Sequence, residues 1–276
     1  MRKMLGEPPA SRGRSPGGGI SVEGLWVRFF GDFEVFYRGE AVDLGRNSKA
    51  IAIFRRLLAN HPQPVSQEVT MEWLWPESGP QKARWSLNSA IYALRGVLGA
   101  LSEDLSGGVA LEGGRYHISS GLQVSSDVQE FGVHYERGRL FERSGEIEEA
   151  VLEYEEAVGF YRDDYLTEDL YEDWTMIERE RLTGGYVNML DRLSDYYVDD
   201  GQLQKSIGVC YQILEKDPYH EESYRRLMRC YSRLGLRSRA AQQYELCRRM
   251  LGRLYGTAPV EETQDLHRRV LRGEAI

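Results

Sequence analysis

The chain has little cysteine and lacks the long apolar runs of membrane and exported proteins. Its three cysteines, Cys210, Cys230 and Cys247, form no CxxC pair. The odd number argues against a disulfide framework or a structural zinc site and predicts a reducing, cytoplasmic compartment. The sequence has no run of about 18 apolar residues and no apolar signal-peptide core near its start. We therefore expect no membrane association.

The sequence also lacks common catalytic motifs. It contains no GxxxxGK[ST] segment, and its five histidines fit no HExxH pattern. Acidic pairs such as Asp163-Asp164 and Asp199-Asp200 are more typical of solvated helix faces than of catalytic dyads. We expect no enzyme activity, no catalytic residue, no cofactor and no bound metal.

Acidic residues are in excess, but their distribution along the chain is uneven. The 276 residues include 35 Lys and Arg against 43 Asp and Glu, a formal net charge of −8. Segment 126–220 alone holds 24 acidic and 9 basic residues, whereas 21–125 holds 11 acidic and 10 basic ones. The total argues against a protein coated with basic charge for nonspecific nucleic-acid binding. The nearly neutral first half can nevertheless carry one basic face.

Composition and periodicity divide the chain into three parts. Residues 1–21 are rich in Gly and Pro, carry Arg2, Lys3, Arg12 and Arg14, and predict a disordered basic arm. Residues 22–125 predict a mixed α/β unit, and residues 126–276 predict an all-α unit.

Short strand patterns and three amphipathic helices alternate in the first unit. Aromatic and β-branched residues over 25–36 predict two strands, and 41–44 predicts a third. Helices are expected from Asn47 or Ser48 to about Asn60, from Ser66 to before Pro76, and from Pro80 to about Leu98. VALEGGRYHIS (109–119) predicts a hairpin. This order is that of a winged helix-turn-helix, whose third helix enters the major groove of DNA.

The third helix separates an apolar face from a polar one. Its predicted buried face consists of Leu87, Ala90, Ile91, Leu94 and Leu98. Arg and Lys suit phosphate or guanine, Asn suits adenine, and Ser suits phosphate or either base edge. The candidate DNA contacts are Lys82, Arg84, Trp85, Asn88, Ser89, Tyr92 and Arg95 on this helix, with Lys49 on the first helix and Arg115 on the hairpin.

The same pattern leaves a second interpretation open. Seven polar or amphipathic residues on one helix face are also typical of a solvated face. Trp85 and Tyr92 can equally be packing residues beside the core.

The second unit contains an internal repeat. Small, aromatic or aliphatic residues recur at spacings of four and three: Ala150, Tyr154 and Ala157; Ser206, Cys210 and Ile213; Ala240, Tyr244 and Cys247. Ser206 and Ala240 are 34 residues apart, the tetratricopeptide period, and Gly145, Gly201 and Gly235 mark the turns. Such helix pairs must stack to bury their apolar faces, so the cysteines are expected to be small buried hydrophobes. Ala150 and Ser206 are 56 residues apart, and we expect the extra 22 residues (161–182) to form an additional helix.

The two units in this order resemble the antibiotic-regulatory-protein (SARP) family of transcriptional activators. The resemblance covers residues 25–272. Its second part is carried by YRDDYL (161–166), Trp174, ERERL (178–182), Asp217-Pro218, ESYRRLMRCYSRLG (222–235) and AAQQYELCRRML (240–251). Its first part is carried by the opening strands, Leu44-Gly45, Leu74-Trp75 and the pattern ARxSLxxxIxxLR from Ala83 to Arg95.

The resemblance implies an OmpR-type winged helix joined to a bacterial transcriptional activator domain of tetratricopeptide-like repeats. It further implies sequence-specific binding to direct repeats in double-stranded promoter DNA, as a possible homodimer, and activation through RNA polymerase and its sigma subunit. The sequence departs from the family at Ala93 and Gly96, where arginine is common. Two missing phosphate contacts would lower the salt dependence of DNA binding by about two units.

A ligand sensor or scaffold is the alternative function. Arg192 and Asp195 match an RxxD pattern seen in some receptors of cyclic dinucleotides, in which arginine stacks on guanine and the carboxylate accepts from its edge. A helix-surface pair at this spacing is the ordinary alternative. A stripe of arginines follows at positions 225, 226, 229, 233, 237 and 239. Three alternatives are open for this stripe: it is balanced by acidic residues of the same chain, it binds a phosphate-bearing effector, or it binds DNA.

Overall fold

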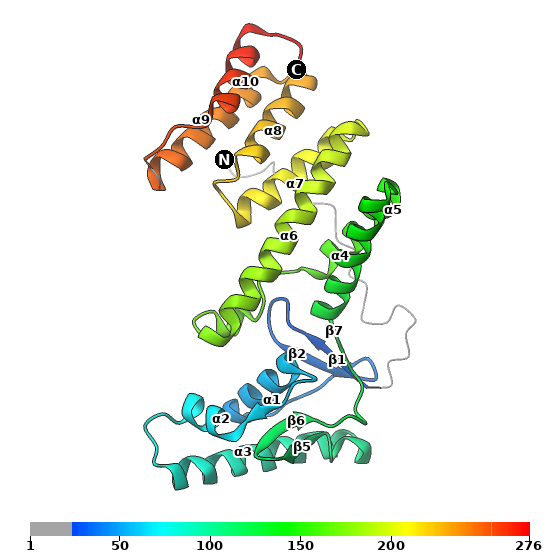
Figure 1. Ribbon diagram of the computed structural model, residues 1–276, viewed down its shortest axis with the longest axis vertical. Coiled ribbons are helices and arrows are strands. Elements are labelled where there is room, and N and C mark those ends of the chain that lie inside the picture. The colour runs from blue at the N-terminus through cyan, green and yellow to red at the C-terminus, as the bar shows by residue number, and fades with distance from the viewer. Residues whose placement is uncertain (1–23, 255) are drawn as a thin grey trace, which may run out of the picture. The chain divides into compact units, whose positions relative to one another are not determined.

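The computed structural model describes residues 24–254 and 256–276 (Figure 1). The predicted basic arm, 1–21, lies outside the described residues. The described chain divides into two compact units, the first ending at Ser126 and the second beginning at Asp127.

The first and the last strand of the first unit belong to one four-stranded sheet. Its strands are β1 (Leu25–Arg28), β2 (Glu34–Tyr37), β3 (Glu40–Ala41) and β7 (Val124–Ser126), in the order β3-β2-β1-β7. β1 pairs antiparallel with β2 and parallel with β7. The last strand of the unit therefore lies beside the first. The third strand is shorter than the predicted 41–44, and β7 has no counterpart among the predicted strands.

Three helices follow the first three strands. They are α1 (Ser48–Asn60), α2 (Gln67–Leu74) and α3 (Pro80–Leu101). The Asn47 side chain accepts a hydrogen bond from the backbone nitrogen of Ala50, and the Ser66 hydroxyl accepts one from that of Glu68, each at 3.1 Å. Each residue thus accepts a hydrogen bond from a backbone N–H of the first helical turn that has no partner within the helix. This is the capping role that the sequence predicts for both.

The wing is a second, three-stranded sheet. Its strands are β4 (Val65–Ser66), β5 (Val109–Glu112) and β6 (Arg115–Ile118), in the order β4-β6-β5. Gly113 and Gly114 join β5 to β6 with φ angles of 54° and 77°. Two consecutive positive φ angles are those of a type I′ turn, which glycine adopts without a steric penalty. The wing predicted from the sequence is therefore confirmed.

The long helix α3 forms the centre of the first unit's core. Leu87, Ala90, Ile91, Leu94 and Leu98 are each at most 3% exposed. The helix packs against α1 and α2. Its apolar stripe is the one that the helical spacing predicts, and the opposite face is left to solvent.

The second unit is a run of seven helices among the described residues (Figure 1). Each packs against the next along the chain. They are α4 (Asp127–Ser144), α5 (Ile147–Phe160), α6 (Asp173–Asp199), α7 (Leu203–Lys216), α8 (Glu221–Arg233), α9 (Arg237–Leu254) and α10 (Glu261–Arg272). Gly145, Gly201 and Gly235 stand in the turns within the three helix pairs, with φ angles of 82°, 74° and 73°. The predicted fold class, a winged helix followed by tetratricopeptide-like helices, is confirmed.

Small side chains let the paired helices approach closely. Ala157, Ser206, Ala240 and the three cysteines have no exposed surface. The cysteines are free thiols, and burial raises the pKa of Cys210 and Cys247 to about 12. They therefore act as small buried hydrophobes, as the repeat pattern predicts.

The segment between the first two repeats differs from the sequence prediction. We expected an extra helix over 161–182, but residues 161–172 form an irregular strap with one short 3₁₀ helix, η2 (Thr167–Asp169), and the remaining residues lengthen α6. Leu166 has a φ of 50° and is fully buried, a backbone conformation that interrupts any helix. Arg179 of α6 donates to the carbonyl oxygens of Tyr165 and Asp169 at 3.0 and 3.1 Å. A side chain thus satisfies backbone groups that a helix would have paired.

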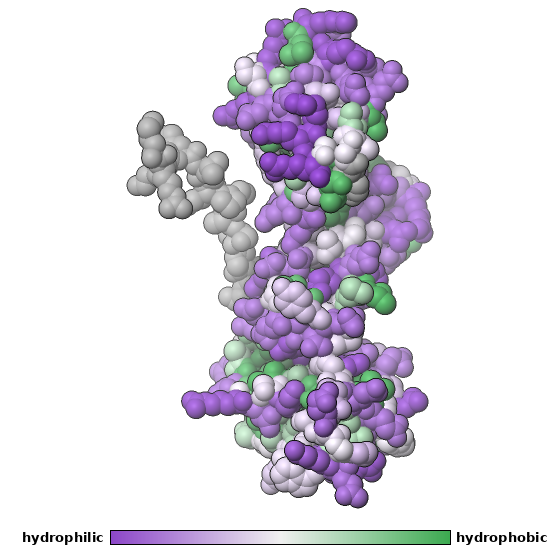
Figure 2. Space-filling model, turned by 90° about the vertical axis from the view of Figure 1, so that its left-hand side faces the viewer, coloured by the Kyte–Doolittle hydropathy of each residue, from purple (hydrophilic) through white to green (hydrophobic). Residues whose placement is uncertain are grey.

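The face shown in Figure 2 is mostly hydrophilic, with small separate apolar patches. Within the described ranges, no helix is both long and apolar enough to span a bilayer. No group of three His, Cys, Asp or Glu side chains in those ranges could hold a metal ion.

Candidate nucleic-acid interface

The outer face of α3 carries the sequence-predicted contact residues. Trp85 and Tyr92 are 73% and 82% exposed, and Asn88 and Ser89 are exposed between them. These four residues follow the spacing i, i+3, i+4 and i+7, so they form one stripe along the helix. We call Trp85, Asn88, Ser89 and Tyr92 the outer stripe. Neither aromatic ring is a core residue, which removes the packing alternative for both.

Basic side chains flank the outer stripe. Lys82 and Arg84 lie in the first two turns of α3, and both are exposed. None of the ion pairs formed within 24–254 and 256–276 involves Lys82, Arg84 or Arg115. Their charges are therefore available to an external anion such as a DNA phosphate.

Arg95 holds a different position from the other candidates. Its Nε donates a hydrogen bond of 3.0 Å to the carbonyl oxygen of Val109 in β5. Burial raises the pKa of Tyr116 in β6, and the positive charges of Arg95 and Arg84 partly offset that effect. Both arginines of α3 therefore lie within electrostatic reach of the wing. Arg95 connects the two elements as well as adding charge.

The tip of the wing brings one cation and one anion together. Arg115 and Glu112 are direct cross-strand partners on either side of the glycine turn, and both are exposed. Opposite charges at such positions attract. The wing thus offers a weaker positive field than Arg115 alone would give.

The start of α1 supplies two exposed cations, one of which was missed in the sequence. Lys49 is exposed, as expected, and so is Arg46, just before the capping Asn47. Arg46 and Ala93 line the same groove of about 190 Å³ between the start of α1 and α3. Ala93 is a position where the resemblance leads one to expect arginine, so Arg46 brings positive charge to that side of α3. No local sequence signal pointed to Arg46, because only the tertiary fold brings it beside Ala93.

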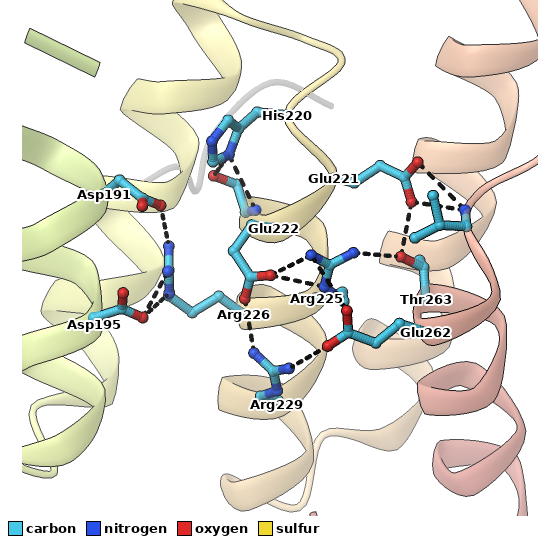
Figure 3. Close-up of polar contacts among 12 residues, drawn as sticks. Asp191, Asp195, His220, Glu221, Glu222, Arg225, Arg226, Arg229, Glu262 and Thr263 are labelled. Atoms are coloured by element: carbon cyan, nitrogen blue, oxygen red, sulfur yellow. Dashed lines mark hydrogen bonds and ion pairs between the residues drawn. The ribbon is translucent and has the colours of Figure 1, made fainter. Parts of the chain in front are cut away.

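The RxxD pair of the second unit does not converge on one point. Arg192 Nε lies 3.3 Å from Glu142 of α4. Asp195 instead accepts from Nε of Arg226 in α8 at 2.9 Å (Figure 3). Each side chain therefore has a partner on a different neighbouring helix. A cyclic-dinucleotide or other effector site at Arg192 and Asp195 stays a prediction.

Arg226 is a buried cation, only 2% exposed. Its Nη1 donates to Asp191 at 2.8 Å and to the Ser194 hydroxyl at 2.6 Å. Burial lowers the pKa of Arg226, but the hydrogen bond and charge of Asp191 and the charge of Asp195 outweigh that effect and raise it. Two carboxylates and a hydroxyl thus compensate one buried charge.

The neighbouring arginines of α8 also have internal partners (Figure 3). Arg225 donates to Glu222 and, at 2.9 Å, to Thr263 of α10. Arg229 pairs with Glu222 at 2.8 Å and with Glu262 at 3.6 Å. Carboxylates of the same chain therefore balance the charges of Arg225, Arg226 and Arg229. This is the first of the three alternatives considered for the stripe.

Comparison with known proteins agrees with both units. The sequence profile of the family described as "Bacterial transcriptional activator domain" matches residues 126–271. Two relatives, each named "Transcriptional regulatory protein MoaR1", come from Mycobacterium bovis (strain BCG / Pasteur 1173P2) and Mycobacterium tuberculosis (strain ATCC 25618 / H37Rv). Each is 23% identical over 242 residues, which cover 88% of this chain and 78% of the relative.

A solved structure shares the fold. The chain of Mycobacterium tuberculosis EmbR, solved in complex with a low affinity phosphopeptide, matches with a TM-score of 0.73 at 22% sequence identity. The match covers 91% of this chain and 66% of that chain, so EmbR extends beyond the part that is shared. The likeness supports the winged helix followed by tetratricopeptide-like helices.

Proposed function

We propose that this chain, which belongs to the bacterial transcriptional activator domain family and is a transcriptional regulator, binds double-stranded promoter DNA through α3 and the wing. The observation that carries the proposal is the outer stripe of α3. It presents Trp85, Asn88, Ser89 and Tyr92 to solvent beside Lys82 and Arg84, two cations that have no ion-pair partner among the described residues.

Each contact residue has a role that follows from its chemistry. Asn88 and Ser89, in the middle of the outer stripe, suit the major-groove edge, where asparagine pairs well with adenine. Arg84 suits guanine or phosphate. Lys49, Lys82 and Arg115 suit the phosphates on either side, and we add Arg46 to them. Arg95 holds the wing against α3 through Val109, so its main role is to position the wing.

Selection from a random-sequence duplex pool tests this proposal and does not require the natural promoter. The full chain is incubated with the pool at low salt, and bound duplexes are amplified and sequenced over several rounds. We expect enrichment of one sequence that the chain binds more tightly than a shuffled duplex of equal composition. Equal binding of both duplexes at every salt concentration would contradict sequence-specific DNA binding.

We propose further that the second unit activates transcription by contacting RNA polymerase or its sigma subunit. Family membership supports this role, as does the acidic character of segment 126–220. The test places the selected sequence upstream of a weak promoter and adds the full chain to bacterial holoenzyme. More transcript is expected only when the selected sequence is present. Binding without stimulation would point to a repressor or accessory role instead.

The number of copies on DNA is part of the same proposal. Direct repeats accommodate two copies in the same orientation, each reading one half-site with its own α3. Footprinting on the selected sequence, singly and in tandem, should show one and two protected segments. Higher affinity per site on the tandem duplex would indicate contact between the copies.

A further inference from the structure

The two aromatic rings at the ends of the outer stripe have no structural role in α3. The core-facing residues of α3, Leu87, Ala90, Ile91, Leu94 and Leu98, are 3% exposed or less, and they lie on the face opposite the two rings. Trp85 and Tyr92, by contrast, are 73% and 82% exposed. Large aromatic surface left in water is unfavourable, and a pair aligned on one helix face between polar residues indicates a surface that a partner covers.

The spacing of the rings fits the geometry of a DNA groove. Tyr92 follows Trp85 by seven positions, which corresponds to two helical turns and about 10.5 Å of helix axis. Base pairs follow one another about every 3.4 Å along the duplex axis. The two rings can therefore reach bases about three positions apart while Asn88 and Ser89 face the bases between them.

The chemistry of the major groove offers such rings one specific partner. Adenine, guanine and cytosine present hydrogen-bond donors and acceptors there, whereas thymine also presents its C5-methyl group. A ring that contacts this methyl group buries apolar surface on both sides. Neither ring adds charge, so the contact does not depend on phosphate neutralisation by the flanking cations.

We propose that Trp85 and Tyr92 read thymine methyl groups at two positions about three base pairs apart. This inference rests on the proposed binding of DNA by α3 and names the feature of the DNA that the outer stripe recognises. It predicts a site in which thymines flank the bases that Asn88 and Ser89 contact.

Replacing thymine by uracil removes the methyl group and leaves the pairing edge unchanged. The duplex enriched by the full chain is resynthesised with deoxyuridine at each thymine in turn, and binding is measured by fluorescence anisotropy at fixed salt. One buried methyl group corresponds to about fourfold in affinity. We expect two thymines at which the substitution weakens binding by about that factor, and about fifteenfold when both are replaced.

Variants assign the effect to the two rings. The W85A variant should bind uracil and thymine alike at one of the two positions, Y92A should do so at the other, and the double variant at both. Tyr92→Phe should keep the discrimination because it keeps the ring. Tyr171→Ala, which removes a 99% exposed tyrosine of the second unit, is the matched control and should leave it unchanged.

The outcomes separate this inference from the proposal beneath it. If no duplex is enriched, binding of DNA by α3 fails and the inference fails with it. If the enriched duplex binds equally well with uracil at every position, the chain still recognises DNA but not through thymine methyl groups. Discrimination that persists in the double variant would assign the methyl contact to other side chains. Each of these last two results would overturn the inference. The first is obtained with the unchanged chain, so it does not depend on whether a variant folds.

Discussion

Arg95 of α3 donates a hydrogen bond from Nε to the carbonyl oxygen of Val109 in β5, at 3.0 Å. The bond joins the helix expected to enter the groove to the hairpin expected to reach the backbone. Because both elements must contact DNA at once, their relative position determines which phosphates and bases fall within reach. Arg95 therefore influences DNA binding through geometry as well as through charge.

The first prediction concerns this bond. Arg95→Met keeps the apolar stem of the side chain but removes the donor, so the free energy of unfolding of the first unit should fall by about 1–2 kcal/mol. Amide hydrogen exchange in β5 and β6 should become faster. Arg84→Met, which removes an exposed arginine of the same helix without an ion pair, is the control. Equal stability of the two variants would show that the Arg95–Val109 bond does not hold the wing.

The second prediction concerns the close approach of α4 and α5. A Cβ atom on Gly138 would lie 2.4 Å from Cε1 of Tyr154, whose ring is buried and whose hydroxyl donates to Glu142 at 2.9 Å. Gly138→Ala therefore forces the two helices apart and should lower the free energy of unfolding by about 1–3 kcal/mol. Urea denaturation followed by circular dichroism measures the change.

Gly132 in the same helix is the matched control for that substitution. An added Cβ there meets no atom within 4 Å. Gly132→Ala should stabilise the chain by up to about 1 kcal/mol, because alanine favours a helix more than glycine does. Destabilisation by both substitutions would contradict close packing as the cause of the Gly138 effect.

The third prediction concerns the buried charge of α8. Arg226→Ala removes the partner of Asp191 and Asp195 and leaves the Ser194 hydroxyl without its donor. We expect a loss of about 3 kcal/mol in unfolding free energy. Asp195→Asn should cost about 1 kcal/mol, because the Asp195 side chain is 55% exposed and Asp191 still compensates Arg226. Denaturation of the two variants measures both losses. A larger loss of unfolding free energy in Asp195→Asn than in Arg226→Ala would contradict this account.

The fourth prediction is a pH dependence at the strap. Burial raises the pKa of Asp164, but hydrogen bonds from Lys216 and Tyr161, at 2.8 and 2.7 Å, outweigh it and lower the pKa. The folded state then binds fewer protons than the unfolded state as both titrate. The stabilisation from Asp164 is therefore present above its unfolded pKa of about 4 and is lost as pH falls through the lowered folded value.

Asp164→Asn isolates this contribution from those of other carboxylates. At pH 7 the variant should be less stable than the parent chain by about 1 kcal/mol, a value reduced by the partial exposure of Asp164. The gap should narrow steadily in urea denaturation between pH 5 and pH 3. A gap that stays constant with pH would show that the ionised carboxylate is not the stabilising form.

Local sequence signals predicted much of this fold because they act over a few residues. The capping positions of Asn47 and Ser66, the apolar stripe of α3 and the turn glycines of the repeats each depend on neighbours within one or two helical turns. β7 could not be predicted this way, because three residues gain their strand conformation only by pairing with β1, about a hundred residues earlier. The strap was predicted wrongly as a helix, since its backbone depends on tertiary contacts such as the hydrogen bonds from Arg179 and the burial of Leu166.

The candidate site shows the same limit. Helical spacing was enough to gather Trp85, Asn88, Ser89 and Tyr92 on one exposed face. The partners of long side chains were not predictable, since Arg95 bonds to a strand 14 residues on and Asp195 to Arg226 on another helix. Arg46 was missed because only the tertiary fold brings the start of α1 beside Ala93.

The central claim, that α3 binds DNA with its outer face, is tested most directly by the salt dependence of duplex binding. The full chain, Arg84→Ala and the control Arg162→Ala, an exposed arginine of the second unit, are titrated with the enriched duplex from 50 to 200 mM salt. If Arg46, Lys49, Lys82, Arg84 and Arg115 each neutralise a phosphate, the parent chain should give a log–log slope of about −4.5. Arg84→Ala should bind at least about tenfold more weakly with a slope shallower by about one, while Arg162→Ala matches the parent. Arg84→Ala binding with the affinity and slope of the parent chain would contradict the account.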